Sequence, residues 1–134
     1  MRSLIVVDSS ALISVLLGEQ ESQQISTAIL EADERQVSTF SILESNIIAF
    51  SRKGQRGQLD LDALFQELDL TAVPFDAEQA QIARQAWNRF GKGRHPAALN
   101  IGDCCSYALA RSVGAPLLCK GNDFSQTDLD LVLY

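Results

Sequence analysis

The sequence predicts an α/β fold, in which strands and helices alternate around a mostly parallel central sheet. The first observation is the continuous apolar run at residues 4–7, which is typical of a strand buried on both faces of a sheet. The second is the helical spacing of apolar residues in segments such as 76–90, through Ala80, Ala83, Trp87 and Phe90. The third is that strand-like and helix-like segments alternate along the chain, which favours a parallel sheet with crossover helices.

The expected elements begin and end where the apolar pattern does. Strands are expected at residues 4–7, 37–40, 71–74, 117–119 and 131–133, and Pro74 places the third at an edge or a strand end. Helices are expected at residues 9–17, 21–32, 42–53, 60–70, 76–90 and 102–113, with a loop from Gly54 to Gly57. No repeat or linker interrupts the 134 residues, so residues 1–134 are interpreted as a single domain.

The composition excludes some classes of function. The formal net charge is −6, which argues against broad, nonspecific coating of nucleic acid but not against a nuclease, because cations can offset a carboxylate site. Cysteines 104, 105 and 119 show neither a disulfide pattern nor zinc-ligand spacing, so they are expected to be small buried residues in a reducing compartment.

The sequence also predicts a cytoplasmic protein with no membrane segment. No stretch reaches the ~18 apolar residues of a membrane span. The N-terminal apolar run carries one positive charge, is broken by Asp8 and shows no cleavage site, so it is interpreted as a strand of the mature fold rather than a signal peptide.

Four acidic residues lie where a parallel sheet would place a ligand site. Asp8 and Asp123 each directly follow an expected strand, Glu44 lies in the first turns of a helix, and Asp103 begins another helix. Ligands of open parallel sheets bind beyond the carboxyl ends of the strands, so these acids could converge at one edge. Each also has an ordinary explanation, as a helix cap, a solvated helix residue, a complement to a helix dipole or a turn residue.

Four stretches that contain these acids cover the chain from end to end. They are IVVDSSAL at 5–12, SILE at 41–44, HPAALNIGDCCSYALA at 95–110 and LLCKGNDF at 117–124. In this order they resemble the PIN-domain ribonucleases, and more narrowly the VapC-type toxins of prokaryotic toxin–antitoxin pairs, with no departure at the acidic positions. The resemblance implies a three-layer sandwich with helices flanking the sheet. It also implies catalytic or metal-binding roles for Asp8, Glu44, Asp103 and Asp123, with Asp128 as a candidate outer member.

The chemistry that the resemblance implies suits these residue types. Phosphodiester hydrolysis needs an activated water, a neutralised phosphate and a stabilised leaving oxygen, and Mg²⁺ or Mn²⁺ can serve all three roles. Mg²⁺ prefers oxygen ligands and is often held by one or two carboxylates. We expect Asp8 and Asp103 to ligate the metal directly, and Glu44 and Asp123 to complete the site. Ser9 either holds a water or phosphate oxygen or is a plain helix cap.

RNA must approach this negative site through basic residues. Arg84, Arg89, Lys92 and Arg94 form the densest basic stretch, and a second patch contains Arg52, Lys53 and Arg56. Such side chains either contact phosphate groups or form a solvated helix face. The single histidine, His95, is interpreted as a loop residue rather than a base, and Tyr107 and Trp87 as core residues.

The resemblance also implies partners. A small antitoxin, usually encoded beside the toxin, would lay a segment over the acidic site and insert a basic side chain. Family members commonly form homodimers, and the apolar residues of the first helix are interpreted either as core or as a contact site: Leu12, Ile13, Leu16 and Leu17.

Three alternatives to the toxin make different demands on the sequence. A PIN-like nuclease of RNA maturation would lack an antitoxin, and a catalytically silent binding module would keep the fold without turnover. An aspartyl phosphatase would need a DxD after the first strand and a receiver an adjacent acidic pair, and both patterns are absent from Asp8-Ser9-Ser10.

Overall fold

The computed structural model describes residues 2–134, and its centre is a sheet of four parallel strands. The strand order is β3-β2-β1-β4, and every neighbouring pair is parallel, as expected. The bounds are Leu4–Val7 for β1, Glu34–Ser38 for β2, Thr71–Val73 for β3 and Leu117–Leu118 for β4. From β1 the chain continues to β2 on one side, whereas β4 lies on the other, so a topological switch point falls between β1 and β4.

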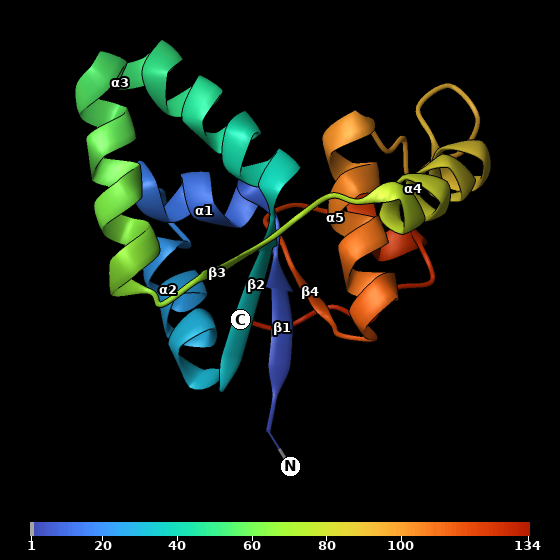
Figure 1. Cartoon of the computed structure of the whole chain (residues 1–134), viewed down its shortest axis with the longest axis horizontal. Coiled ribbons are helices and arrows are strands. Elements are labelled where there is room, and N and C mark those ends of the chain that lie inside the picture. Colours follow the sequence, from blue (N-terminus) through green and yellow to red (C-terminus); the bar gives the residue numbers. More distant parts are fainter. Residues whose placement is uncertain (1) are drawn as a thin grey trace.

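Helices cover both faces of this sheet, which confirms the expected three layers (Figure 1). Helices α1 (Ser9–Leu16), α2 (Ser22–Glu31) and α3 (Thr39–Glu67) lie on one side, and α4 (Ala77–Phe90) and α5 (Ile101–Val113) on the other. Strand β1 alternates between the two layers of core, because Val6 packs with the α4–α5 cluster while Ile5 and Val7 pack with the other.

Helix α3 differs most from its expected form. The predicted break between two helices is confirmed at Gly54, which leaves the helical conformation with φ 62° and ψ −153°, so two helical segments meet there at a kink. The predicted loop was too long, because residues 55–57 already belong to the second segment. The conformation of Gly54 suits glycine and kinks the helix. Gly57 has a packing role instead, because a Cβ there would lie 2.4 Å from the carbonyl oxygen of Ala49. Gly54 therefore marks the junction of the two helical segments, and Gly57 allows the second segment to pack closely against the first.

Other expectations were wrong at the ends of elements. The strand expected at 37–40 begins at Glu34 and ends at Ser38, whose hydroxyl caps α3. The strand expected at 131–133 is reduced to a bridge between Leu131 and Leu117, and the tail is otherwise irregular. Trp87, expected in the core, is 38% exposed.

The cysteines are free and buried, as expected. In the first helix, Leu12 belongs to the core, whereas Ile13, Leu16 and Leu17 are only partly covered. None of the helices in the described part of the chain combines the length and apolar composition that a bilayer-spanning segment requires.

Candidate active site

Asp8 is fixed at the junction of β1 and α1. It is the N-cap of α1, and its carboxylate accepts hydrogen bonds from the Ser10 N–H at 3.0 Å and from Ser106 Oγ at 2.5 Å. Ser106 belongs to α5, and its hydroxyl also lies 3.1 Å from Ser41 Oγ of α3. The side chain of Asp8 is thus held at the carboxyl end of the central strand by groups from two helices.

Asp103 lies in the first turn of α5 and forms a capping box with Asn100. The Asn100 N–H donates to Asp103 Oδ2 at 3.0 Å, and the Asp103 N–H donates to Asn100 Oδ1 at 2.8 Å. These reciprocal bonds satisfy free N–H groups at the start of the helix. Asp103 therefore supports the start of the helix, which is its ordinary structural explanation. Its second carboxylate oxygen, Oδ1, has no hydrogen bond to the described residues.

Glu44 reaches the same region from the second turn of α3. Ser9 Oγ donates to Glu44 Oε1 at 2.6 Å and orients that carboxylate. Asp8 rather than Ser9 is the N-cap of α1, and the holding of a water or phosphate oxygen by Ser9 stays a prediction. The carboxylate of Glu44 also lies against the backbone of Gly102 at the start of α5. Glu44 therefore connects the beginnings of α1 and α5.

Asp123 enters from the opposite side of β1. It is the first residue of the 3₁₀ helix Asp123–Gln126, which follows β4, and it is exposed. Asp8 and β4 are joined directly, because the Asp8 N–H donates to the Leu118 carbonyl at 2.9 Å. Asp8 and Asp123 thus flank the switch point between β1 and β4.

The electrostatics of Asp103 show that the four acids share one region. Burial raises the pKa of Asp103 to about 7, the hydrogen bond from Asn100 opposes this rise, and the charges of Asp8, Asp123 and Glu44 raise the pKa further. Burial and the charges of Asp8, Asp103 and Asp123 likewise raise the pKa of the Cys119 thiol to about 12. Negative charge is therefore concentrated at the carboxyl edge of the sheet. No positively charged side chain is among the groups that shift the pKa of Asp103 or Cys119.

The donor set suits a hard divalent cation, although it is not arranged as a finished site. Carboxylate oxygens are the ligands that Mg²⁺ and Mn²⁺ prefer. Among residues 2–134, no three acidic, cysteine or histidine side chains are already grouped closely enough to hold an ion. The four carboxylates therefore suit a hard divalent cation in the chemistry of their oxygens.

Comparison with known proteins places this geometry in a family. The family model of the PIN domain matches residues 5–129. The chain belongs to the PIN-domain family. Ribonuclease VapC of Mycolicibacterium smegmatis is 44% identical over 127 residues, which cover 95% of this chain and 98% of the relative. This PIN-domain chain is therefore a ribonuclease of the VapC type, the toxin class that the sequence motifs predicted.

Solved structures show the PIN fold as well. VapC20 of Mycobacterium tuberculosis, described as a Sarcin-Ricin loop cleaving toxin, matches with a TM-score of 0.77 at 16% identity, over 93% of this chain and 95% of that chain. A toxin–antitoxin complex from Klebsiella pneumoniae matches with a TM-score of 0.68 at 17% identity, over 92% of each chain. At these identities the likeness shows the shared fold alone.

Asp128, the candidate outer member of the PIN-domain site, has other partners. Tyr107 OH donates to Asp128 Oδ1 at 2.7 Å, and Arg89 and Arg111 lie 3.2 and 3.8 Å from Asp128 Oδ2. Asp128 is not among the charges that shift the pKa of Asp103. Its contacts tie the C-terminal tail to α4 and α5, which indicates a structural role.

Some of the basic residues of α4 and the following loop are paired within the protein, and others are free to contact a ligand. Arg89 is engaged by Asp128 and also lies 4.6 Å from the centre of the Phe90 ring. Arg84, Lys92 and Arg94 are exposed. His95 packs edge-on against Phe90 and its Nδ1 accepts from the Ala97 N–H at 3.0 Å, so it remains a loop residue as expected.

Sequence reasoning missed two residues of this PIN-domain site, Ser106 and Gly102. Ser106 follows Asp103 by three positions on a helix, so it lies on the same face, and that spacing was a usable signal. Gly102 stands in the first turn of α5, where glycine weakens a helix, and that disadvantage was the second signal.

Proposed function

We propose that this VapC-type ribonuclease depends on a divalent metal, Mg²⁺ or Mn²⁺, held by Asp8, Glu44, Asp103 and Asp123. The observation that carries the proposal is the buried carboxyl of Asp103, whose pKa is raised to about 7 by burial and by the charges of the other three acids. Clustered carboxylates repel one another, and a bound cation offsets that repulsion. The site therefore has a physical reason to bind a metal.

Each acid has a position that suits a particular role. Asp8 and Asp103 are buried and anchored at helix starts, so they are the fixed ligands of the proposed site. Glu44 is oriented by Ser9, and Asp123 is exposed on the far side, so these two would complete the site and orient the attacking water. When bound, the metal supplies charge neutralisation at the phosphate and lowers the pKa of water.

The substrate of the proposed reaction is RNA, which would approach from the exposed side of α4 and the loop before α5. Arg84, Lys92 and Arg94 lie there with exposed side chains. Arginine and lysine contacts to phosphate position a nucleic acid without reading its sequence. These residues would bring the backbone of RNA to an otherwise repulsive acidic site.

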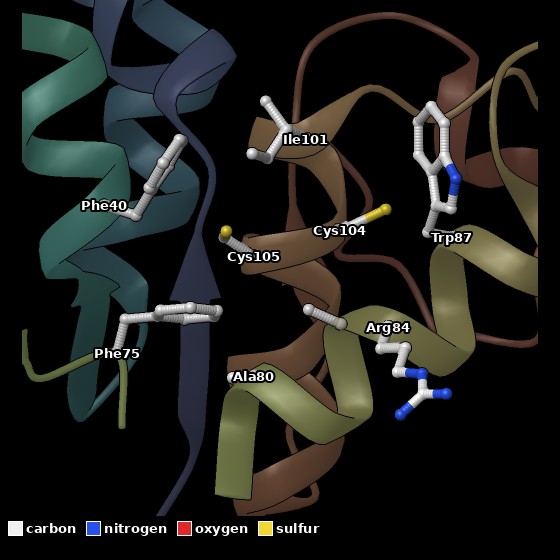
Figure 2. Close-up of a pocket in the computed structure, with 9 residues that line it drawn as sticks. Phe40, Phe75, Ala80, Arg84, Trp87, Ile101, Cys104 and Cys105 are labelled. Carbon is white, nitrogen blue, oxygen red and sulfur yellow. The ribbon is translucent and has the colours of Figure 1, made fainter. Parts of the chain in front are cut away.

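The proposed protein partner is a small antitoxin with an apolar face and a basic side chain. A hollow of about 500 Å³ opens between the start of α3 and α4, and Figure 2 shows Phe40 and Phe75 on one side of it and Trp87 on the other, with Ile101, Cys104 and Cys105 of α5 between them. Its lining is almost entirely apolar, and its only charged residue is Arg84.

This hollow adjoins both more apolar surface and the acids. Leu43, Ile47 and Phe50 of α3 are spaced i, i+4, i+7 and form an apolar stripe. Leu43 and Ile47 are each 58% exposed and Phe50 is 56% exposed, so this stripe faces solvent. Glu44 lies beside Phe40, Leu43 and Ile47 in a second, smaller hollow. A partner helix that packs its apolar face on this surface would place a basic side chain beside the acids. The positive charge of that side chain would be attracted by their negative charge. The Klebsiella pneumoniae structure of the same fold is itself a toxin–antitoxin complex.

Cleavage of total RNA by the purified chain tests the metal proposal. With Mg²⁺ or Mn²⁺ we expect cleavage, and with a chelator none. Asp103→Asn keeps the acceptor for Asn100 and removes the charge, so it should stay folded and cleave at least about 100-fold more slowly. Glu31→Gln, an equivalent change on the exposed surface of α2, is the control. Undiminished cleavage in chelator, or by Asp103→Asn, would contradict the proposal.

A further inference from the structure

The carboxylate of Glu44 occupies a space that exists only because residue 102 has no side chain. A Cβ added to Gly102 would lie 2.4 Å from Glu44 Oε2, 2.7 Å from Glu44 Oε1 and 2.9 Å from Glu44 Cδ. Real Cβ atoms essentially never approach other atoms within 3.0 Å. Any other residue at position 102 would therefore compete with Glu44 for this space.

The backbone does not explain this glycine. Gly102 is the second residue of α5 and has ordinary helical geometry, unlike Gly54 or Gly114, whose φ angles are positive. Glycine is among the poorest helix formers, so alanine would favour the helix itself. The advantage of glycine at this position must come from the space that it leaves.

Glu44 is also held from the opposite side. Ser9 Oγ donates to Glu44 Oε1 at 2.6 Å, and Ser9 follows Asp8 directly. On the other side, Gly102 precedes Asp103 directly. The carboxylate of Glu44 is thus enclosed between the residue next to Asp8 and the residue next to Asp103. The position of the Glu44 carboxylate relative to Asp8 and Asp103 therefore depends on both neighbours, Ser9 and Gly102.

We propose that Gly102 is a positioning residue of the acidic site: the absence of its side chain admits Glu44 to the site, beside Asp103 and within reach of Ser9. A methyl group at position 102 displaces the carboxylate of Glu44 and breaks its hydrogen bond with Ser9. The consequence for metal and RNA rests on the proposed function, whereas the displacement of Glu44 does not.

The direct test is a crystal structure of the metal-free Gly102→Ala protein. The expected result is a Glu44 carboxylate turned away from Ser9, with α5 in place. A Glu44 carboxylate that keeps its bond to Ser9, because the first turn of α5 has moved instead, would overturn the proposal. This readout needs no activity, so it decides the matter even if the proposed metal dependence fails.

A double-mutant cycle tests the consequence for the site. Mn²⁺ binding by calorimetry should weaken about 10- to 100-fold in Gly102→Ala, the usual cost of losing a supporting contact at a metal site. Glu44→Asp shortens the side chain by one methylene and makes room for the added methyl group. It should therefore weaken Mn²⁺ binding in the wild-type background and restore part of it in the Gly102→Ala background.

The outcomes of this cycle separate the two proposals. If Glu44→Asp lowers Mn²⁺ affinity by the same factor in both backgrounds, residues 44 and 102 act independently and Gly102 has no positioning role. If the wild-type protein binds no Mn²⁺, the proposed function fails, and the crystal structure still judges the role of Gly102. Thermal unfolding of each variant identifies any loss that comes from misfolding.

Discussion

Asp103 combines two duties that conflict in the absence of a cation. As a capping residue it accepts a hydrogen bond from Asn100 and stabilises the start of α5. As a buried acid near Asp8, Glu44 and Asp123 it resists ionisation, and its pKa rises to about 7. An asparagine would keep the hydrogen bond and remove the charge, so the two duties can be separated by one substitution.

The first prediction is that Asp103→Asn stabilises the metal-free protein at alkaline pH. The folded state holds the proton of Asp103 up to about pH 7, whereas the unfolded chain releases it near 3.8. The folded state therefore binds more protons in this window, and the wild type loses stability as the pH rises through it. In chelator at pH 8, the variant should unfold about 3 °C or more above the wild type.

The pH dependence provides the control for this prediction. At pH 4, where Asp103 is largely protonated in the folded state, the two melting temperatures should differ much less. Adding Mg²⁺ at pH 8 should raise the melting temperature of the wild type more than that of the variant. Equal melting temperatures at both pH values would show that Asp103 carries no electrostatic cost.

Position along the chain indicated that the four acids could converge, and the resemblance to PIN domains singled them out, but neither revealed which contacts hold them. Asp8, Glu44, Asp103 and Asp123 each follow a strand or open a helix, and such positions can be read from the apolar pattern. Ser106 bonds to Asp8 across 98 residues of sequence, and Glu44 meets Gly102 from a different helix far away in the sequence. Contacts of this kind depend on how α3 and α5 are packed, which periodicity in one segment cannot reveal.

At the scale of elements, α3 presents an apolar stripe to solvent rather than to the core. Leu43, Ile47 and Phe50 have the spacing of a buried helix face, yet each is more than half exposed. The other side of the same turns is covered through Ser41, Ser45 and Ala49. The small residues thus face the protein, and the large apolar ones remain available to a partner.

The second prediction is that Ile47→Asp disrupts binding of the proposed antitoxin. A buried aspartate on an apolar contact surface lacks partners, so the dissociation constant should rise about 30-fold or more, equivalent to ~2 kcal/mol. The measurement is calorimetric titration with the proposed antitoxin. Leu30→Asp, a change of the same kind at a site on α2 that is 54% exposed, should bind normally. Equal losses in both variants would point to a general effect of charge.

The same scale shows where the sequence pattern predicts a fold and where it does not. Each of the six expected helices and four of the five expected strands overlap observed elements, with 42–53 and 60–70 both falling within α3, because long amphipathic segments and short apolar runs carry strong signals. The errors lie where one residue decides between two structures. Gly54 alone separates the two helical segments of α3 where a four-residue loop was predicted, and Leu131 makes one bridge to Leu117 without forming a strand.

For the whole molecule, the net charge of −6 means that RNA meets a repulsive field. Association with a polyanion must then depend on a few local cations. Arg89 is engaged by Asp128, which leaves Lys92 and Arg94 as exposed cations in the loop before α5. Because the loop leads directly into the helix that carries Asp103, contacts there would guide the phosphate backbone toward the acids.

The third prediction is that the double variant Lys92→Ala/Arg94→Ala binds RNA more weakly and with less dependence on salt. Each lost phosphate contact lowers the slope of log affinity against log salt by about 1, so the double variant should lose about 2. KM for RNA should rise while kcat changes little, since neither side chain contacts the acids. The control is Arg2→Ala, whose side chain is 74% exposed before β1, at the edge of the sheet opposite the acids. An unchanged salt slope in the double variant would show that RNA reaches the acids by another route. The same measurement would then be made on variants of the second basic patch, which contains Arg52, Lys53 and Arg56.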